Sequence, residues 1–288
     1  MGPFSTRIEK LRRERGTLLM GVLNVTPDSF FDGGRFHAAS DARARIDELA
    51  REGADVLDIG AESTRPGAAA ISDEEQILRL EPALRHAVGT GIWVSVDTAS
   101  PKVARFALEH GAHLINDVSC LADVGLASVC AEFGAPLVLM HSRGPQAAMQ
   151  GFSVYPDEGY GDVIEEVRLE WRAAKARAVE AGMLESEIYF DPGLGFAKNA
   201  RQSFALLGGL ARFRAEGVIV VGPSRKSFIA SVDGAPPSER LGGSVAAALL
   251  AVARGATIVR AHDVREVRQA LAVAAVIERE SAGAVHAG

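Results

Sequence analysis

The sequence has few cysteines, no long apolar run and no excess of basic residues, and each shortage excludes a class of protein. Only Cys120 and Cys130 are cysteines, which argues against a disulfide-rich secreted scaffold and predicts free thiols in a reducing compartment. The longest apolar runs, Val245–Ala253 and Ala270–Ile277, are well short of the roughly 18 residues that a membrane-spanning helix needs. The N-terminus also lacks the apolar stretch of a secretory signal, so we expect a cytoplasmic protein.

The charge balance limits the partners of the protein. With 31 Lys and Arg against 37 Asp and Glu, the formal net charge of −6 provides no global field for nucleic acid or an anionic membrane, and we expect neither as a partner. An anionic ligand must therefore be bound by a local basic cluster. Neither of the glycine-rich phosphate-loop patterns, G-x-x-x-x-G-K-[ST] and G-x-G-x-x-G, occurs, which disfavours an open nucleotide-binding sheet.

Short apolar runs alternate with amphipathic segments along most of the chain, as in repeated βα units. The predicted strands are Leu18–Val25, Val56–Gly60, Ile92–Asp97, Leu114–Val118, Pro136–His141, Ile188–Asp191, Val218–Gly222 and Ile258–His262. The predicted helices are Asp41–Glu52, Asp73–Val88, Pro101–His110, Leu121–Phe133, Glu158–Gly182, Arg201–Arg214, Pro237–Arg254 and Val264–Arg279, with Ser40, Ser72 and Ser100 as start signals. One helix after each of eight strands predicts a single (β/α)8 TIM barrel. We expect a lead-in over residues 1–17, the catalytic barrel over residues 18–280 and a frayed tail over residues 281–288.

Polar residues stand at the carboxyl end of every predicted strand, where barrel enzymes place their active sites. In chain order they are Asn24, Asp58 with Glu62 to Arg65, Asp97, Asn116, His141, Asp191, Ser224 to Lys226, and Arg260 with His262. Any one of them has even odds of being only a cap or turn residue, but a carboxylate inside an apolar run is costly without a partner. Together they predict a site at one mouth of the barrel.

The residue types in this ring predict two kinds of recognition. The carboxylates and amide of Asp97, Asn116 and Asp191 can pair with the N–H edge of a flat, nitrogen-rich heterocycle. A second set suits the oxygens of a phosphate or pyrophosphate, namely Ser63, Thr64, Arg65, Arg260 and His262. Lys226 fits three roles that the sequence does not separate: donor to the ring, phosphate partner or Schiff-base nucleophile.

Other residues have a more ordinary interpretation. We favour a satisfied core or turn histidine for His141, and packing rather than ligand stacking for Trp93 and Trp171. Phe196 is harder to explain as a core residue, because it lies in a glycine-bounded loop next to Lys198.

Seven motifs, in this order, make the chain resemble the dihydropteroate synthase family, the sulfonamide target of folate synthesis. They are Gly21-Val-Leu-Asn-Val-Thr-Pro-Asp-Ser-Phe30, Asp58-Ile-Gly-Ala-Glu-Ser-Thr-Arg-Pro-Gly67, Ser95-Val-Asp-Thr98, Ile115-Asn-Asp-Val118, Asp191-Pro-Gly-Leu-Gly-Phe196, Ser224-Arg-Lys-Ser227 and Arg260-Ala-His262. The resemblance implies condensation of 6-hydroxymethyl-7,8-dihydropterin pyrophosphate with 4-aminobenzoate to 7,8-dihydropteroate and pyrophosphate, with help from Mg2+. It also implies a homodimer, for which the apolar face of Leu271, Ala274, Ala275 and Ile277 is a candidate.

The resemblance further implies a role for each matching residue. The pterin would be held by Asp97, Asn116, Met140, Asp191, Gly222, Lys226 and Arg260. The diphosphate would be bound by Asn24, Ser63, Thr64, Arg260 and His262, with Asn24 also contacting the metal. The aminobenzoate would be received by Phe30, Thr64, Pro66, Phe196 and Ser227. Catalysis would involve Asp97, Lys226, Asp32 and Asn24.

Several departures and alternatives accompany this resemblance. Ala61, Ser142 and Pro223 differ from the residues usual in the family, which affects loop shape more than chemistry. The alternatives are a methyltransferase that passes a methyl group from a folate to a corrinoid, a barrel aldolase with Lys226 as nucleophile, and a non-catalytic pterin-binding paralogue. The intact loops after the first two strands disfavour the methyltransferase, which needs no diphosphate cluster.

Overall fold

The structure, a computed structural model, describes residues 3–25, 34–62, 71–144, 151 and 153–285. In these residues an eight-stranded parallel sheet has the order β6-β5-β4-β3-β2-β1-β8-β7. Its strands are β1 (Leu18–Asn24), β2 (Val56–Gly60), β3 (Trp93–Asp97), β4 (Leu114–Asp117), β5 (Leu137–Met140), β6 (Ile188–Asp191), β7 (Val220–Val221) and β8 (Ile258–Ala261). The two outer strands of this order meet at a bridge between Phe190 and Ile219, which brings the sheet round into a nearly closed barrel. The predicted (β/α)8 barrel is confirmed.

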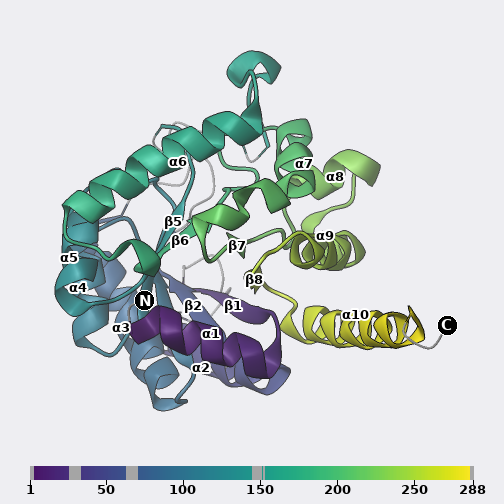
Figure 1. Ribbon diagram of the computed structural model, residues 1–288. Coiled ribbons are helices and arrows are strands. Elements are labelled where there is room, and N and C mark those ends of the chain that lie inside the picture. Colours follow the sequence, from purple (N-terminus) through teal and green to yellow (C-terminus); the bar gives the residue numbers. More distant parts are fainter. Residues whose placement is uncertain (1–2, 26–33, 63–70, 145–150, 152, 286–288) are drawn as a thin grey trace.

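Helices surround the strands on the outside of the barrel (Figure 1). They are α1 (Pro3–Arg15), α2 (Gly34–Glu52), α3 (Asp73–Gly89), α4 (Pro101–Glu109), α5 (Gly125–Phe133), α6 (Val163–Glu180), α7 (Ala200–Gly208), α8 (Ser227–Asp233), α9 (Leu241–Ala253) and α10 (Val264–Val285). Short 3-10 helices lie at Asp157–Gly159, Glu185–Glu187, Leu210–Glu216 and Pro237–Glu239.

Several predicted helices differ from the structure. Glu158–Gly182 begins only at Val163, where Asp162 is the N-cap, and Arg201–Arg214 is divided at Gly209 into α7 and a 3-10 helix. Two others are interrupted by local backbone chemistry. The prediction of one helix after each strand is wrong after β7, where α8 precedes α9: Gly234 ends α8 with a left-handed φ of 76°, and two prolines follow before α9. The predicted start of a helix at Leu121 is also wrong. Cys120 and Leu121 have φ of 61° and 57°, and Asp117 accepts the amide of Leu121 at 2.6 Å, so the chain forms a loop until Gly125.

The helix start signals have mixed outcomes. Ser72 and Ser100 cap α3 and α4 as predicted, accepting the amides of Glu75 at 3.2 Å and Val103 at 3.3 Å. Ser40 does not begin a helix, because α2 already runs from Gly34. The expected lead-in contains α1, and α10 continues to Val285, beyond the predicted end of the domain at residue 280.

Alternation of side chains along each strand divides the core into two parts. The outward-facing positions, such as Leu57, Ile59 and Val94, belong to the large cluster between strands and helices. A smaller cluster fills the barrel near the amino ends of the strands, where Ile8 of α1 covers it from outside; it comprises Ile8, Leu18, Met20, Val56, Trp93, Leu114, Val138, Tyr189, Val220 and Ile258. The predicted packing role of Trp93 is thereby confirmed. So is that of Trp171, which is fully buried and donates its indole N–H to the carbonyl of Leu139 at 2.8 Å.

Candidate active site

The same alternation places polar side chains inside the barrel near the carboxyl ends of the strands. On β2 the inward sequence runs from Val56 to Asp58, and on β3 from Trp93 through Ser95 to Asp97. On both strands, the inward position two residues after the apolar side chain is therefore polar. Pairing of β3 with β4 places Asp97 beside Asn116. The barrel thus gathers at one end the polar residues that lie far apart in the sequence.

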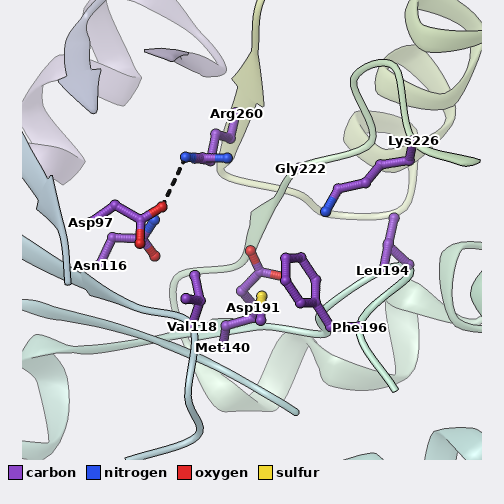
Figure 2. Close-up of a pocket in the computed structure, with 10 residues that line it drawn as sticks. All are labelled: Asp97, Asn116, Val118, Met140, Asp191, Leu194, Phe196, Gly222, Lys226 and Arg260. Carbon is purple, nitrogen blue, oxygen red and sulfur yellow. Dashed lines mark hydrogen bonds and ion pairs between the residues drawn. The ribbon is translucent and has the colours of Figure 1, made fainter. Parts of the chain in front are cut away.

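Arg260 connects three strands across this end of the barrel. Its Nε donates to Oδ2 of Asp58 at 2.6 Å and its Nη2 to Oδ2 of Asp97 at 3.1 Å, the latter drawn as a dashed line in Figure 2. Asn116 also donates to Oδ2 of Asp58, at 3.2 Å. The other oxygen of Asp58 is buried and has no hydrogen-bond partner among the described residues. By accepting a hydrogen bond from each, Asp58 orients both Arg260 and Asn116.

A pocket lies in front of these residues. All seven residues expected to hold a pterin line it, together with Val118, Leu194 and Phe196 (Figure 2). Val118, Met140 and Phe196 form a small apolar cluster, and Nζ of Lys226 lies 4.0 Å from the centroid of the Phe196 ring. The pocket therefore combines carboxylates, an amide and two cations with an apolar wall, as a flat polar ring requires.

Burial shifts the protonation of the ionisable groups in this pocket. It raises the pKa of Asp97 to about 7, against the lowering effect of Arg260 and with the help of Asp58 and Asp117. Burial also raises the pKa of Asp191, although the amide of Gly193 donates to that carboxylate at 2.7 Å. The pKa of Lys226 is lowered to about 7, first by burial and then by the charge of Arg260. These groups are poised for a ligand that supplies the missing hydrogen bonds and charge.

His262 and Asn24 are two residues expected to bind the diphosphate that do not line the pocket. Oγ of Ser224 lies 3.1 Å from Nδ1 of His262, and burial followed by the charge of Arg260 lowers the pKa of His262 to about 3. The imidazole is therefore neutral in the free protein at neutral pH. Asn24 ends β1 and is exposed.

Not all of the expected site residues can be placed. Phe30, Asp32, Ser63, Thr64 and Pro66 lie outside the described residues. Ser227 begins α8, and its hydroxyl donates to Oγ of Ser153 at 2.8 Å, which brings the loop between β5 and α6 to the same region.

Sequence reasoning gave no site role to three residues that the structure places at or behind the pocket. Asp58 was among the polar residues at the strand ends, but it received no specific role. Its position on a strand next to β3 could have indicated that it supports the site. Ser153 had no signal, because nothing in its surroundings predicts the left-handed φ of 61° that turns it toward Ser227. Lys198 is fully buried, which the sequence did not suggest. His141 has the predicted role of a satisfied core histidine, fully buried and paired with Glu170 at 3.0 Å.

The described residues contain no group of three or more His, Cys, Asp or Glu side chains that could hold a metal ion. None of the helices in that part of the chain has the length and apolar character needed to cross a membrane.

Comparison with known proteins identifies the family. The model of the pterin binding enzyme family matches residues 20–262. The chain belongs to the pterin-binding enzyme family. Dihydropteroate synthase of Escherichia coli strain K12 is 42% identical over 257 residues, covering 88% of this chain and 89% of that protein. Dihydropteroate synthase of Bacillus subtilis is 38% identical over 287 residues, covering 98% and 95%.

Solved structures of the pterin-binding family share the architecture. Dihydropteroate synthase of Xanthomonas albilineans, solved with 4-aminobenzoic acid, has a TM-score of 0.84 at 39% identity, covering 91% of this chain and 93% of that one. The Burkholderia cenocepacia enzyme, complexed with 7,8-dihydropteroate, has a TM-score of 0.82 at 38% identity, covering 93% of each chain.

Proposed function

We propose that this chain is a dihydropteroate synthase, a transferase that joins 6-hydroxymethyl-7,8-dihydropterin pyrophosphate to 4-aminobenzoate with release of pyrophosphate. The relatives named for this reaction span nearly the whole chain, and solved relatives contain aminobenzoate or dihydropteroate. The single observation in the structure that carries the proposal is the pocket beneath Arg260, where Asp97, Asn116 and Asp191 face one enclosed space.

The geometry accounts for recognition of both parts of the pterin substrate. Asp97 and Asp191 can accept hydrogen bonds from ring nitrogens, and the amide of Asn116 is held by Asp58 for the same ring. Arg260 is linked to the carboxylates through Nε and Nη2, so among the described residues its Nη1 remains to meet an oxyanion. His262 lies two residues farther along the chain and supplies a second donor once protonated.

The reaction breaks one bond and forms another at the exocyclic methylene of the pterin. The carbon–oxygen bond breaks with its electron pair leaving on pyrophosphate, and positive charge develops on the methylene and the ring. The aromatic amine then shares its lone pair with that carbon and loses a proton. Asp97, beside the ring, stabilises the developing cation electrostatically, and the buried setting strengthens this interaction.

The donor set at the mouth also fits Mg2+, which we propose as a cofactor. Mg2+ binds oxygen ligands and typically combines one or two protein groups with substrate phosphates and water, so the amide oxygen of the exposed residue Asn24 would be a suitable single ligand. Bound there with the diphosphate, the ion would neutralise charge on the leaving group.

The decisive test measures pyrophosphate release from the purified protein. We expect release only when the pterin diphosphate, 4-aminobenzoate and Mg2+ are all present. Arg260→Ala should weaken pyrophosphate binding in calorimetry by about tenfold or more, because a charged hydrogen-bond donor is lost. The control is Arg85→Ala, which removes an exposed arginine paired with Glu81 on α3. Methyl transfer without pyrophosphate release would instead establish the methyltransferase alternative, and ligand binding without turnover the non-catalytic paralogue.

Three further properties belong to this proposal. We propose a homodimer through the outer face of α9 and α10, where Leu250, Val273, Val276 and Ile277 are exposed, whereas Leu271 packs against the core. Ile277→Asp should then yield a monomer in light scattering.

Sulfonamides should compete with aminobenzoate for the Phe196 end of the pocket. The two free cysteines agree with a cytoplasmic location.

A further inference from the structure

Lys198 is a fully buried lysine that does not line the pocket. It lies in the β6–α7 loop (residues 192–199), two residues after Phe196. Its Nζ lies 2.9 Å from Nδ1 of His141, 2.9 Å from the carbonyl oxygen of Phe196 and 3.3 Å from the carbonyl oxygen of His141. A buried cation is expensive, so a specific set of acceptors around it calls for an explanation.

The three contacts define the protonation of this cluster. An ammonium group has three N–H donors and no acceptor, which matches three acceptors around Nζ. Nδ1 of His141 must then accept, so Nε2 carries the hydrogen and donates to Glu170 at 3.0 Å. Burial lowers the pKa of His141 to about 4, in agreement with a neutral ring. Burial lowers the pKa of Lys198 to about 7, so below this pH the ammonium joins the end of β5 to the loop after β6.

The β6–α7 loop needs such support because its backbone is unusual. Gly193, Gly195 and Ala197 have left-handed φ values of 67°, 79° and 45°. A Cβ on Gly193 would lie 2.0 Å from the carbonyl oxygen of His141, so the loop presses directly against β5 at this point. The carbonyl of Phe196 turns inward to Lys198 while its ring forms the wall of the pocket.

A second set of contacts, through Arg143 and Tyr160, also holds the β6–α7 loop. Arg143 donates to Glu170 at 2.9 Å and lies 3.7 Å above the ring of Tyr160. The hydroxyl of Tyr160 donates to the carbonyl of Ala197 at 3.1 Å. Lys198 and Tyr160 thus hold consecutive carbonyls of one loop, Lys198 from the end of β5 and Tyr160 from the side of α6.

We propose that Lys198 is a positioning residue, whose ammonium fixes the β6–α7 loop against β5 and thereby sets the ring of Phe196 at the aminobenzoate end of the pocket. The naming of aminobenzoate rests on the proposed function, whereas the fixing of the loop does not.

The first test separates the two substrates. Lys198→Met keeps the length of the side chain and removes all three donors. We expect the KM for aminobenzoate to rise about tenfold, while the dissociation constant of the pterin diphosphate changes by less than about twofold. Lys102→Met, which removes an exposed lysine paired with Glu74, should change neither. An equal loss for both substrates would mean general damage and would overturn the proposal.

A double-mutant cycle tests whether Lys198 acts through Phe196. In a Phe196→Ala background, Lys198→Met should add less than about a twofold increase in the KM for aminobenzoate, because the ring that it positions is gone. Additive effects of the two substitutions would overturn the proposed route.

Hydrogen exchange of the ligand-free protein gives a result that does not depend on activity. The amide of Phe196 donates to the carbonyl of Gly193 at 3.1 Å and that of Gly195 to Oγ of Ser203 at 3.1 Å. Both should exchange about tenfold faster in Lys198→Met while amides of β3 keep their rates. If the variant does not fold, Lys198→Gln provides the same comparison with a shorter side chain. Unchanged exchange would overturn the loop-fixing role, and failure of the wild type to release pyrophosphate would overturn only the proposed function.

Discussion

The two ends of the barrel are built from the same strands and do opposite things. Near the amino ends, inward-facing Val56, Trp93 and Tyr189 pack into an apolar plug beneath Ile8 of α1. Farther along those strands, by two residues on β2 and β6 and by four on β3, Asp58, Asp191 and Asp97 occupy inward positions, where burial raises the pKa of the Asp97 and Asp191 carboxyls. A step of two to four residues along the same strands therefore separates packing that stabilises the fold from charge that costs stability and serves a ligand.

Buried carboxylates at both ends show the difference most directly. Asp55, just before β2, accepts the amide of Leu19 at 2.8 Å and hydrogen bonds from Arg15 and Arg268. Among the described residues, Asp97 has a single arginine partner, which it shares with Asp58. One carboxylate is satisfied by the folded chain, whereas the other is left partly unsatisfied until a ligand arrives.

Removing the charge of Asp97 should have the largest effect of the changes considered. Asp97→Asn keeps the shape of the side chain but cannot stabilise a cation, so kcat should fall by about 10²-fold or more, beyond any loss of pterin affinity. Single-turnover kinetics at saturating pterin diphosphate measures the chemical step directly. A wild-type rate would mean that Asp97 only positions the ring.

At the opposite end, Asp55→Ala should reverse this pattern. It leaves the amide of Leu19 without its acceptor and separates Arg15 from Arg268, so the free energy of unfolding should fall by about 2 kcal/mol. Because the arginines can turn to solvent, the larger cost of a stranded buried charge does not apply. Urea denaturation gives the stability and the pyrophosphate assay gives kcat, which should stay within about twofold of wild type. A large loss of kcat in folded protein would contradict the division between the ends.

Lys226→Met should stabilise the free protein while lowering its activity. Because burial lowers the pKa of Lys226 to about 7, the unfolded chain holds this proton more tightly than the folded one near neutral pH. The variant should therefore unfold with a free energy higher by about 1 kcal/mol. As the pH rises from about 7 to about 10, the wild type should regain stability relative to the variant, since the unfolded lysine then loses its proton too. A less stable variant at neutral pH would contradict this expectation.

The contrast between the ends also explains what the sequence could predict. The barrel could be predicted from strands of nearly continuous Val, Ile and Leu and from the glycines between the elements. The pocket lining could be predicted from the polar residues at the end of each strand. The sequence did not predict the specific role of Asp58, because its partners Asn116 and Arg260 are distant in sequence and are brought to it only by the strand order. It also did not predict the loops around Cys120 and Ser153, because left-handed φ at non-glycine residues depends on tertiary contacts rather than local preference.

Each end of the barrel also has a histidine whose pKa is lowered by burial. Burial lowers the pKa of His262 to about 3, and that of His113, beside Trp93, is lowered by burial with a contribution from Arg7. A lowered folded-state pKa means that the unfolded chain binds more protons as the pH falls below the ordinary value, so stability is lost with acidification. Between about pH 7.5 and about pH 5.5, His262 should account for a loss of about 1.4 kcal/mol. His262→Gln should remove that part of the slope. His113→Gln should remove less, because His113 is only partly buried. Urea unfolding of the wild type and both variants at the two pH values measures how much each histidine contributes to the pH dependence of the free energy of unfolding. A larger contribution from His113 than from His262 would contradict the stronger desolvation of His262.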